Sequence, residues 1–381
     1  MTAGRQPARA VVAFDAFKGS LTALEACEAA ARGIRAAVPG TDVALVPMAD
    51  GGEGSLDAVL ARGGEERVTR TVDALGRPAL ARWALEGTHA VIELAQAAGL
   101  PQVEDVPLAP LAASTTGLGA VVLDALERGA DELTLLLGGS ATTDGGAGLL
   151  TALGVQLLDA SGRPVRTGGG GLGSLEHLDA TGLDARARAA RWRFVTDVDA
   201  PLTGPGGAAA VFGPQKGASP VDVAALDAAL ERFARVAASA LGVDVAGIAD
   251  VPGAGAAGGV ASVLRALTGG EIVAGGAWFA ELAGLDAALE GADLVLTGEG
   301  RFDGQSALGK VVSVVHAAAR RAGAPLAVIA GSVDAVAASS MGVPALSIAP
   351  GPASLDELQR DAASLVEAAA ATVARLALRP R

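Results

Sequence analysis

Short aliphatic runs alternate with alanine-rich stretches along most of the chain. In the clearest unit, ARAVVAF (8–14) predicts a buried strand, DAFKGS (15–20) a loop at its carboxyl end, and LTALEACEAAARGIRAAVPG (21–40) a helix. Thr22 and Glu25 have the spacing of a capping box, which predicts that the helix begins there. Repetition of this strand, loop and helix pattern predicts an α/β fold with a mainly parallel sheet.

Most of the other predicted strands also end in polar or glycine-rich loops. These strands are DVALVPMA, HAVIELA, ELTLLLGG, RWRFVTDVD, ADLVLTGEG, APLAVIAGS and PALSIAP. Ligands of open α/β sheets bind beyond the carboxyl ends of the strands, so the residues found there are candidates for a functional site. They are Asp15 and Lys18, Asp50 and Glu53, Glu93, Ser140 and Asp144, Asp197 and Asp199, and Glu299 and Asp303.

The side chains at these strand ends include the kinds of group that phosphoryl transfer requires. Cationic groups bind phosphates, carboxylates hold Mg²⁺, and a further carboxylate orients and deprotonates the attacking hydroxyl. A single carboxylate at a strand end is usually a helix cap or part of a turn, so the prediction depends on the coincidence of several. The pattern therefore indicates a kinase-like site without a familiar kinase motif.

Two glycine-rich segments match known nucleotide motifs only in part. PGAGAAGG (252–259) has dinucleotide-binding spacing, but ADVP before it does not predict the usual strand. GQSALGKV (304–311) has the spacing of a Walker A loop up to Lys310, but Val311 stands where the motif needs Ser or Thr. Neither segment by itself predicts a dehydrogenase or a P-loop enzyme.

Composition and charge narrow the class of protein. The length of 381 residues suits two domains, and the absence of tyrosine excludes any mechanism that uses one. The 29 basic and 42 acidic residues give a net charge of −13, which argues against nucleic-acid binding. No signal peptide or good membrane span is recognisable, and the single Cys27 excludes an intramolecular disulfide. We expect a soluble cytoplasmic protein with small-molecule substrates and no nucleic-acid or membrane partner; a homodimer is left open.

Taken together and in order, the motifs resemble the bacterial glycerate kinase family. The segments are FDAFKGSLTALEA, PMADGGEGS, IELAQAAGL, LGGSATTDGGAGLLTALG, TDVDAPLTGPGGAAAVFGPQKGA, PGAGAAGG and LTGEGRFDGQSALGKV. The resemblance implies an enzyme that uses Mg²⁺ and ATP to phosphorylate D-glycerate, with 2-phosphoglycerate favoured over 3-phosphoglycerate. It also implies two α/β domains. We place a Rossmann-like domain at residues 1–75 and 286–381, an inserted domain at 76–285, and the active site in the cleft between them.

The resemblance also suggests roles for individual residues. Asp197 is the candidate catalytic base and Lys18 a second catalytic group. Substrate binding is predicted for Lys18, Asp50, Ser140, Asp144 and Lys216. Nucleotide binding is predicted for Gly298, Glu299, Gly300, Arg301, Asp303 and Lys310, and Mg²⁺ binding for Asp50, Glu53 and Glu299.

The sequence departs from the family pattern at a few positions. Thr143 and Ala200 stand where asparagine is common, and STTGLG (114–119) lacks the usual tyrosine. Alanine cannot replace an amide hydrogen bond, so a substrate contact at position 200 is in doubt. Two alternatives therefore stay open: a kinase of another short hydroxy acid, and a nucleotide or metabolite sensor without catalytic activity. Spacing alone does not say which glycerate hydroxyl is phosphorylated.

Overall fold

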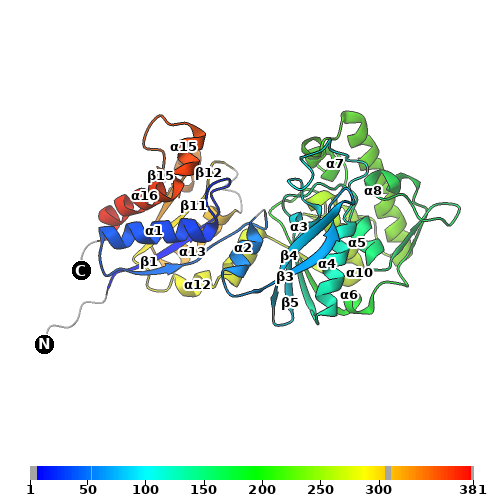
Figure 1. Cartoon of the computed structure of the whole chain (residues 1–381), viewed down its shortest axis with the longest axis horizontal. Coiled ribbons are helices and arrows are strands. Elements are labelled where there is room, and N and C mark those ends of the chain that lie inside the picture. The colour runs from blue at the N-terminus through cyan, green and yellow to red at the C-terminus, as the bar shows by residue number, and fades with distance from the viewer. Residues whose placement is uncertain (1–6, 53, 305–309, 379–381) are drawn as a thin grey trace. The chain divides into compact units, whose positions relative to one another are not determined.

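The computed structural model describes residues 7–52, 54–304 and 310–378, and the chain divides into two compact units (Figure 1). The first unit contains residues 1–50 and 274–381, and the second contains 51–273. This division falls at residues 50 and 273, whereas the sequence placed it near 75 and 285. The fold is α/β with mainly parallel sheets, which confirms the predicted fold class.

The first unit is built on a parallel five-stranded sheet in the order β2-β1-β11-β13-β15. Its strands are β1 (Arg9–Phe14), β2 (Asp42–Leu45), β11 (Leu294–Gly298), β13 (Leu326–Ala330) and β15 (Ala345–Ser347), and β12 (Arg301–Phe302) pairs separately with β14 (Ser332–Val333). After β1 the chain adds β2 on one side of β1, and it later returns to add β11, β13 and β15 on the other side. The loops after β1 and β11 therefore flank the topological switch point, where ligands of such sheets bind.

Helices cover both faces of this sheet because alternate strand residues point to opposite sides. On β13, Ile329 packs in the cluster that includes α1 and α16, whereas Val328 and Ala330 pack in the cluster that includes α13. The helices of the unit are α1 (Ala23–Ala37), α11 (Gly275–Leu282), α12 (Leu285–Ala288), α13 (Val311–Ala322), α14 (Ala335–Met341), α15 (Leu355–Arg360) and α16 (Ala362–Ala377).

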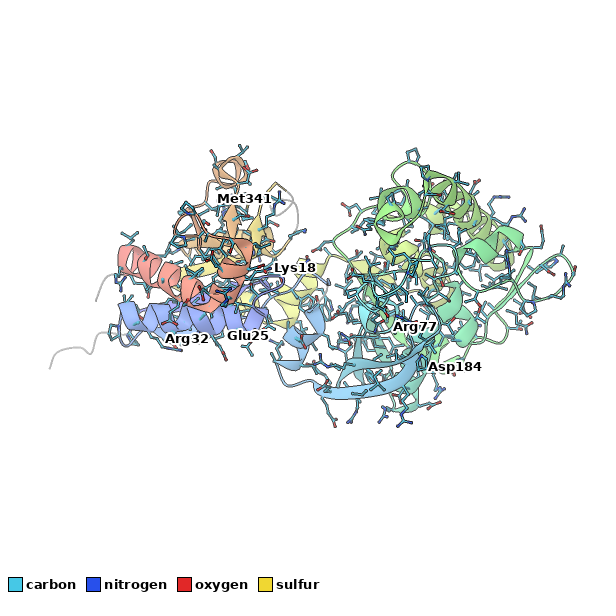
Figure 2. The ribbon with its side chains drawn as sticks, turned by 45° about the horizontal axis from the view of Figure 1, so that its top comes forward. Lys18, Glu25, Arg32, Arg77, Asp184 and Met341 are labelled. Carbon is cyan, nitrogen blue, oxygen red and sulfur yellow. The ribbon has the colours of Figure 1, made fainter. Side chains whose placement is uncertain are left out.

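The first helix begins as the sequence predicts and packs closely on the last one. The Thr22 hydroxyl accepts a hydrogen bond from the Glu25 amide, and the Glu25 carboxylate accepts one from the Thr22 amide, forming the capping box. A side chain at Gly33 would lie 2.1 Å from the Glu367 carbonyl oxygen on α16, so this crossing requires a glycine. Arg32, labelled in Figure 2, pairs with Glu367 beside the crossing.

The second unit contains a mixed six-stranded sheet in the order β10-β9-β6-β5-β4-β3. Neighbours from β10 to β5 are parallel, and β4 and β3 complete the edge in antiparallel pairs. Its strands are β3 (Glu65–Val72), β4 (Pro78–Glu86), β5 (His89–Glu93), β6 (Glu132–Leu136), β9 (Arg191–Val195) and β10 (Glu271–Val273), with a separate small hairpin of β7 (Gln156–Leu158) and β8 (His177–Asp179).

Short helices and one long helix surround the sheet of the second unit. They are α2 (Ser55–Leu60), α3 (Ala95–Ala98), α4 (Thr116–Glu127), α5 (Ala147–Ala152), α6 (Ala185–Ala189), α7 (Ala208–Phe212), α8 (Pro220–Leu241), α9 (Ala246–Ala249) and α10 (Val260–Thr268), with 3₁₀ turns at Gly169–Ser174, Pro214–Lys216 and Ala256–Gly258. Among the described residues, no helix is both long and apolar enough to cross a membrane.

The boundary expected near residue 75 falls on a hairpin turn inside the second unit. The segment DALGRP joins β3 to β4, and the buried Asp73 carboxylate accepts hydrogen bonds from the amides of Leu75 and Arg77. Arg77, labelled in Figure 2, also forms an ion pair with Asp73. The turn residues that resemble a linker in the sequence are thus the tightly bonded end of a hairpin.

Candidate active site

In the first unit, the switch point carries a group of carboxylates and Lys18. The amide of Asp15 donates to the Gly298 carbonyl at 2.9 Å, which joins the end of β1 to the end of β11. Burial, reinforced by the charges of Asp50 and Glu299, raises the pKa of Asp15 to about 8, while Lys18 and a backbone hydrogen bond oppose the rise. The surroundings of Asp15 therefore favour the protonated form of its carboxyl group.

Asp50 and Glu299 lie near enough to Asp15 for their charges to raise its pKa, and a group of carboxylates of this kind fits a hard cation. Mg²⁺ prefers oxygen ligands, and in kinases it is typically held by one or two carboxylates together with substrate phosphates. No group of three or more His, Cys, Asp or Glu residues that could hold a metal occurs within the described part of the chain. Asp50 and Glu299 thus suit a shared site that phosphate oxygens complete, whereas Glu53 lies outside the described residues.

The GEGRFDG segment (298–304) leaves β11 and forms the short strand β12. Arg301 is 78% exposed and its guanidinium lies 3.1 Å from the Asp303 carboxylate, so the segment contains an ion pair. At Gly298 a side chain would meet the Ile329 carbonyl oxygen at 1.7 Å. Packing against β13 is therefore a sufficient reason for glycine at this position, and its contact with a nucleotide stays a prediction.

Lys310 lies at the start of α13, as its N-cap residue. Its carbonyl accepts a hydrogen bond from the Ser313 hydroxyl, which is a local feature of the helix start. Residues 305–309 of the Walker-like segment lie outside the described residues.

In the second unit, Asp144 is the centre of a buried hydrogen-bond network. Its carboxylate accepts hydrogen bonds from the amides of Thr115, Gly146 and Gly148 and from the Thr115 hydroxyl, at 2.9 to 3.2 Å. The Thr115 hydroxyl in turn accepts from the Leu149 amide at 3.0 Å. Burial raises the pKa of Asp144 in spite of these donors. This carboxylate joins the start of α4 to the start of α5.

Lys216 supplies a positive charge beneath the same loop. Its side chain is 2% exposed, and its ammonium donates to the Ser140 hydroxyl at 2.8 Å and to the Thr142 carbonyl at 2.5 Å. Burial lowers the pKa of Lys216 to about 7, and the charge of Asp144 opposes this. The hydroxyls of Thr142 and Thr143 are buried without hydrogen-bond partners among the described residues. The loop thus combines a buried lysine with two buried hydroxyls that have no partner among the described residues.

The PGAGAAGG segment (252–259) is a structural support for this loop. The Gly145 amide donates to the Gly258 carbonyl at 2.9 Å, and a side chain at Gly258 would lie 2.1 Å from the Thr142 carbonyl oxygen. The Gly255 amide donates to the Ala200 carbonyl at 2.9 Å. The glycines that mimic a dinucleotide motif therefore allow three backbone segments to approach one another.

The predicted base, Asp197, follows β9 and is half-buried. Ala200, three residues later, contacts the PGAGAAGG segment through its main chain, a contact that does not depend on the side chain found there. On β5, the Glu93 carboxylate accepts from the Leu56 amide at 3.1 Å and so caps α2. These strand ends together with the SATTDGG loop (140–146) form the polar edge of the second unit.

The predicted site residues are divided between the two units. Lys18, Asp50, Glu299, Gly300, Arg301, Asp303 and Lys310 belong to the first unit, and Ser140, Asp144, Asp197 and Lys216 to the second. Two residues were assigned no role from the sequence. Asp15 was noted only as a strand end, although burial and two neighbouring carboxylates raise its pKa. Thr115 lies in a segment that was noted only for lacking a tyrosine, although its hydroxyl donates to Asp144.

Comparisons with known proteins agree over nearly the whole chain. Residues 10–378 match the sequence profile of the Glycerate kinase family. The chain is 41% identical over 371 residues to a glycerate kinase of Halalkalibacterium halodurans, covering 96% of this chain and 97% of that protein. It is 42% identical over 326 residues to a glycerate 2-kinase of Escherichia coli K12, covering 85% of each. A crystal structure assigned to a glycerate kinase 2 of Salmonella typhimurium LT2 superposes with a TM-score of 0.86 at 38% identity, covering 97% of this chain and 98% of that one.

The Asp144 network makes a testable prediction about stability. Thr115→Val keeps the shape of the side chain but removes a donor to a buried carboxylate and an acceptor for the Leu149 amide. We expect the free energy of unfolding, measured by urea titration, to fall by about 1–3 kcal/mol. Thr142→Val is the matched control, because this equally buried hydroxyl has no partner among the described residues. If the free energy of unfolding falls equally in the two variants, the Thr115 hydroxyl does not have the stabilising role given to it.

Proposed function

The chain belongs to the glycerate kinase family, and from this premise we propose that it transfers the γ-phosphoryl group of ATP to a hydroxyl group of D-glycerate. The predicted enzyme class, an ATP-dependent kinase of a small molecule, is confirmed by the family and its relatives. The main support for this function is the match of residues 10–378 to the Glycerate kinase family. We favour 2-phosphoglycerate as the product because one relative is a glycerate 2-kinase.

We assign the nucleotide phosphates to the first unit. Lys18 follows β1 at the switch point, and its ammonium suits a phosphate oxygen. Asp50 and Glu299 are the proposed protein ligands of Mg²⁺, which when bound would neutralise charge that develops on the transferred phosphoryl group. Arg301 and Asp303 extend from the same edge, and Lys310 begins the helix that follows. The pKa of Asp15 is raised mainly by burial and further by the charges of Asp50 and Glu299, so a cation bound beside these carboxylates would offset their repulsion.

We assign the acceptor to the SATTDGG loop (140–146) of the second unit. Lys216 lies beneath this loop and attracts an anion such as the glycerate carboxylate. The unpartnered hydroxyls of Thr142 and Thr143 can donate to the acceptor, and the Ser140 hydroxyl still has its own proton to donate. The protein's own donors occupy the Asp144 carboxylate, so we propose that Asp144 positions the loop and does not itself contact the substrate.

We propose Asp197 as the group that receives the proton of the acceptor hydroxyl. The hydroxyl oxygen forms a bond to the γ-phosphorus while the bond to the bridging oxygen breaks, and ADP leaves. An ordinary aspartate is a weak base at neutral pH, but positioning contributes more than basicity when the transition state is loose. Lys18 stabilises the negative charge of the phosphoryl group during the transfer.

The product tests the proposed reaction directly. We expect phosphorus NMR of a reaction containing glycerate, ATP, Mg²⁺ and the protein to show ADP and a phosphoglycerate. Phosphorus on the C2 hydroxyl couples to the single proton at C2 and gives a doublet, whereas phosphorus on C3 couples to two protons and gives a triplet. A triplet would contradict the proposed position. If the phosphoryl group is transferred faster to another short hydroxy acid than to glycerate, that acid is the acceptor. If it is transferred to no hydroxy acid, the protein is better explained as a sensor.

The role of Asp197 predicts a selective loss of turnover. Asp197→Asn keeps the size of the side chain but removes the proton acceptor, so kcat should fall about 10²-fold or more while the KM for ATP changes little. Asp131→Asn is the control, because Asp131 is exposed and precedes β6 at the opposite end of the same sheet. If the Asp197→Asn enzyme turns over as fast as the control, Asp197 is not the base.

The depressed pKa of Lys216 predicts that glycerate binding depends on pH. Below a pKa of about 7 the ammonium is already protonated, and above it anion binding must take up a proton. The dissociation constant for glycerate should therefore rise with pH from 7 to 9, by up to about tenfold per unit. Calorimetry at pH 8 in buffers of different ionisation enthalpy measures the proton uptake. The Lys216→Met variant should bind glycerate weakly and without taking up a proton. If the wild-type protein binds glycerate equally well at every pH from 7 to 9, Lys216 does not bind the glycerate carboxylate.

A further inference from the structure

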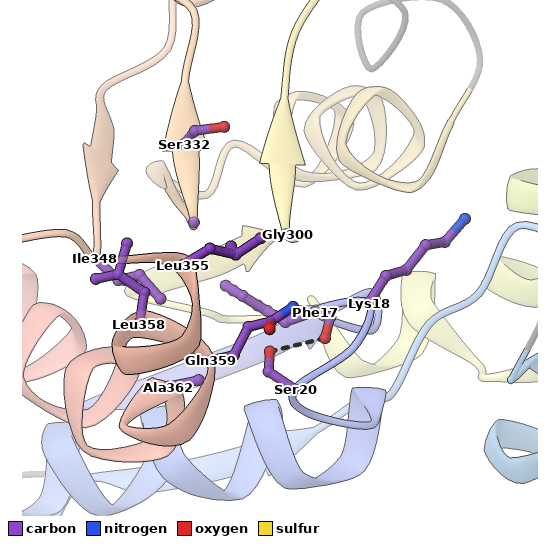
Figure 3. A pocket seen from close by; sticks show the side chains of 11 residues that line it. Phe17, Lys18, Ser20, Gly300, Ser332, Ile348, Leu355, Leu358, Gln359 and Ala362 are labelled. Atoms are coloured by element: carbon purple, nitrogen blue, oxygen red, sulfur yellow. Dashed lines mark hydrogen bonds between the residues drawn. The ribbon is translucent and has the colours of Figure 1, made fainter. Parts of the chain in front are cut away.

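A small cavity in the first unit lies beside the proposed phosphate site. Its volume is about 180 Å³, and it lies between α15 and the loops that follow β1, β11, β13 and β15 (Figure 3). Phe17, Gly300, Ser332 and Ile348 form its walls on the side of the sheet. Phe17, Gly300 and Ile348 lie in the segments that follow β1, β11 and β15, and Ser332 begins β14 just after β13. The cavity therefore lies at the carboxyl edge of the sheet, next to the switch point.

The short helix α15 forms the opposite wall and has no buried residue of its own. A complete capping box between Ser354 and Glu357 fixes its first turn. Leu355 lines the cavity yet is 68% exposed, and Leu358 lines it one turn later. This helix therefore presents an apolar surface that the described part of the protein leaves uncovered, on the side of a preformed cavity.

A single amide side chain lies among these apolar walls. Gln359 lines the cavity, and its amide nitrogen lies 2.8 Å from the position that a side chain at Gly19 would take. Within the described residues, the Gln359 amide makes no hydrogen bond. It offers one donor and one acceptor side by side, which is the arrangement that pairs with the edge of an adenine ring.

We propose that this cavity binds the purine base of the nucleotide. A volume of about 180 Å³ is below the roughly 300–1,000 Å³ of sites that enclose a whole drug-sized ligand, so it suits one ring system of a larger molecule. Lys18 lines the same cavity, and in Figure 3 its chain extends away from Gln359 and Ile348. With the purine base beside Gln359, the ammonium of Lys18 can still bind the phosphates of the same nucleotide. This inference rests on the proposed kinase function.

Calorimetric titration with ADP and with inorganic tripolyphosphate separates binding of the base from binding of the phosphates. Gln359→Ala and Leu355→Ser should each weaken ADP binding about tenfold and raise the KM for ATP by a similar factor. Tripolyphosphate binding and the KM for glycerate should be unchanged. Leu376→Ser is the matched control, because Leu376 on α16 is also a largely exposed leucine, at 82%, and does not line the cavity.

Failure of this inference and failure of the proposed function give different results. If the wild-type protein phosphorylates glycerate but both variants bind ADP as the control does, the base lies elsewhere and the kinase assignment stands. If ADP binding depends on Gln359 and Leu355 but no acceptor is phosphorylated, the cavity is a base site and the function is wrong. Equal weakening of ADP and tripolyphosphate would also overturn the inference, because the variants would then have disturbed the phosphate site.

Discussion

The parallel pairing of β1 with β11 is the constraint on which the first unit depends. It aligns Ala10 with Leu294 and Phe14 with Gly298, and so joins the two ends of the chain in the middle of one sheet. The pairing also creates the switch point, since β2 lies on one side of these strands and β13 on the other. Loops that leave neighbouring strands on this edge bring Asp15, Lys18 and Glu299 together although they are distant in sequence.

The second unit solves a different physical problem, which is to hold a glycine-rich loop in one conformation. The loop is buried throughout, and polar contacts define its shape. Asp144 fixes it from one side through main-chain donors, Lys216 from beneath, and the PGAGAAGG segment (252–259) through its carbonyl and amide groups. Networks of this kind are rigid when every member is satisfied, which leaves the unpartnered threonine hydroxyls as the groups that can respond to a ligand.

The sequence was sufficient to predict the fold class, the capping of α1 and the enzyme class, because each depends on local patterns or on motif order. The domain boundaries were misplaced, because the hairpin turn at DALGRP (73–78) has the residues of a linker and only pairing with β4 reveals it. The role of Thr115 depends on a contact across 29 positions, which no spacing encodes.

The division of the chain also affects how the protein can form during synthesis. Residues 51–273 are continuous, so the second unit is complete on the ribosome before β11 has been made. Translation of the intervening residues takes on the order of tens of seconds, during which β1, a buried central strand of the mature sheet, lacks one of its two neighbours. An apolar strand with an open edge is prone to aggregate, so the nascent N-terminus is the segment for which a holding chaperone would matter most.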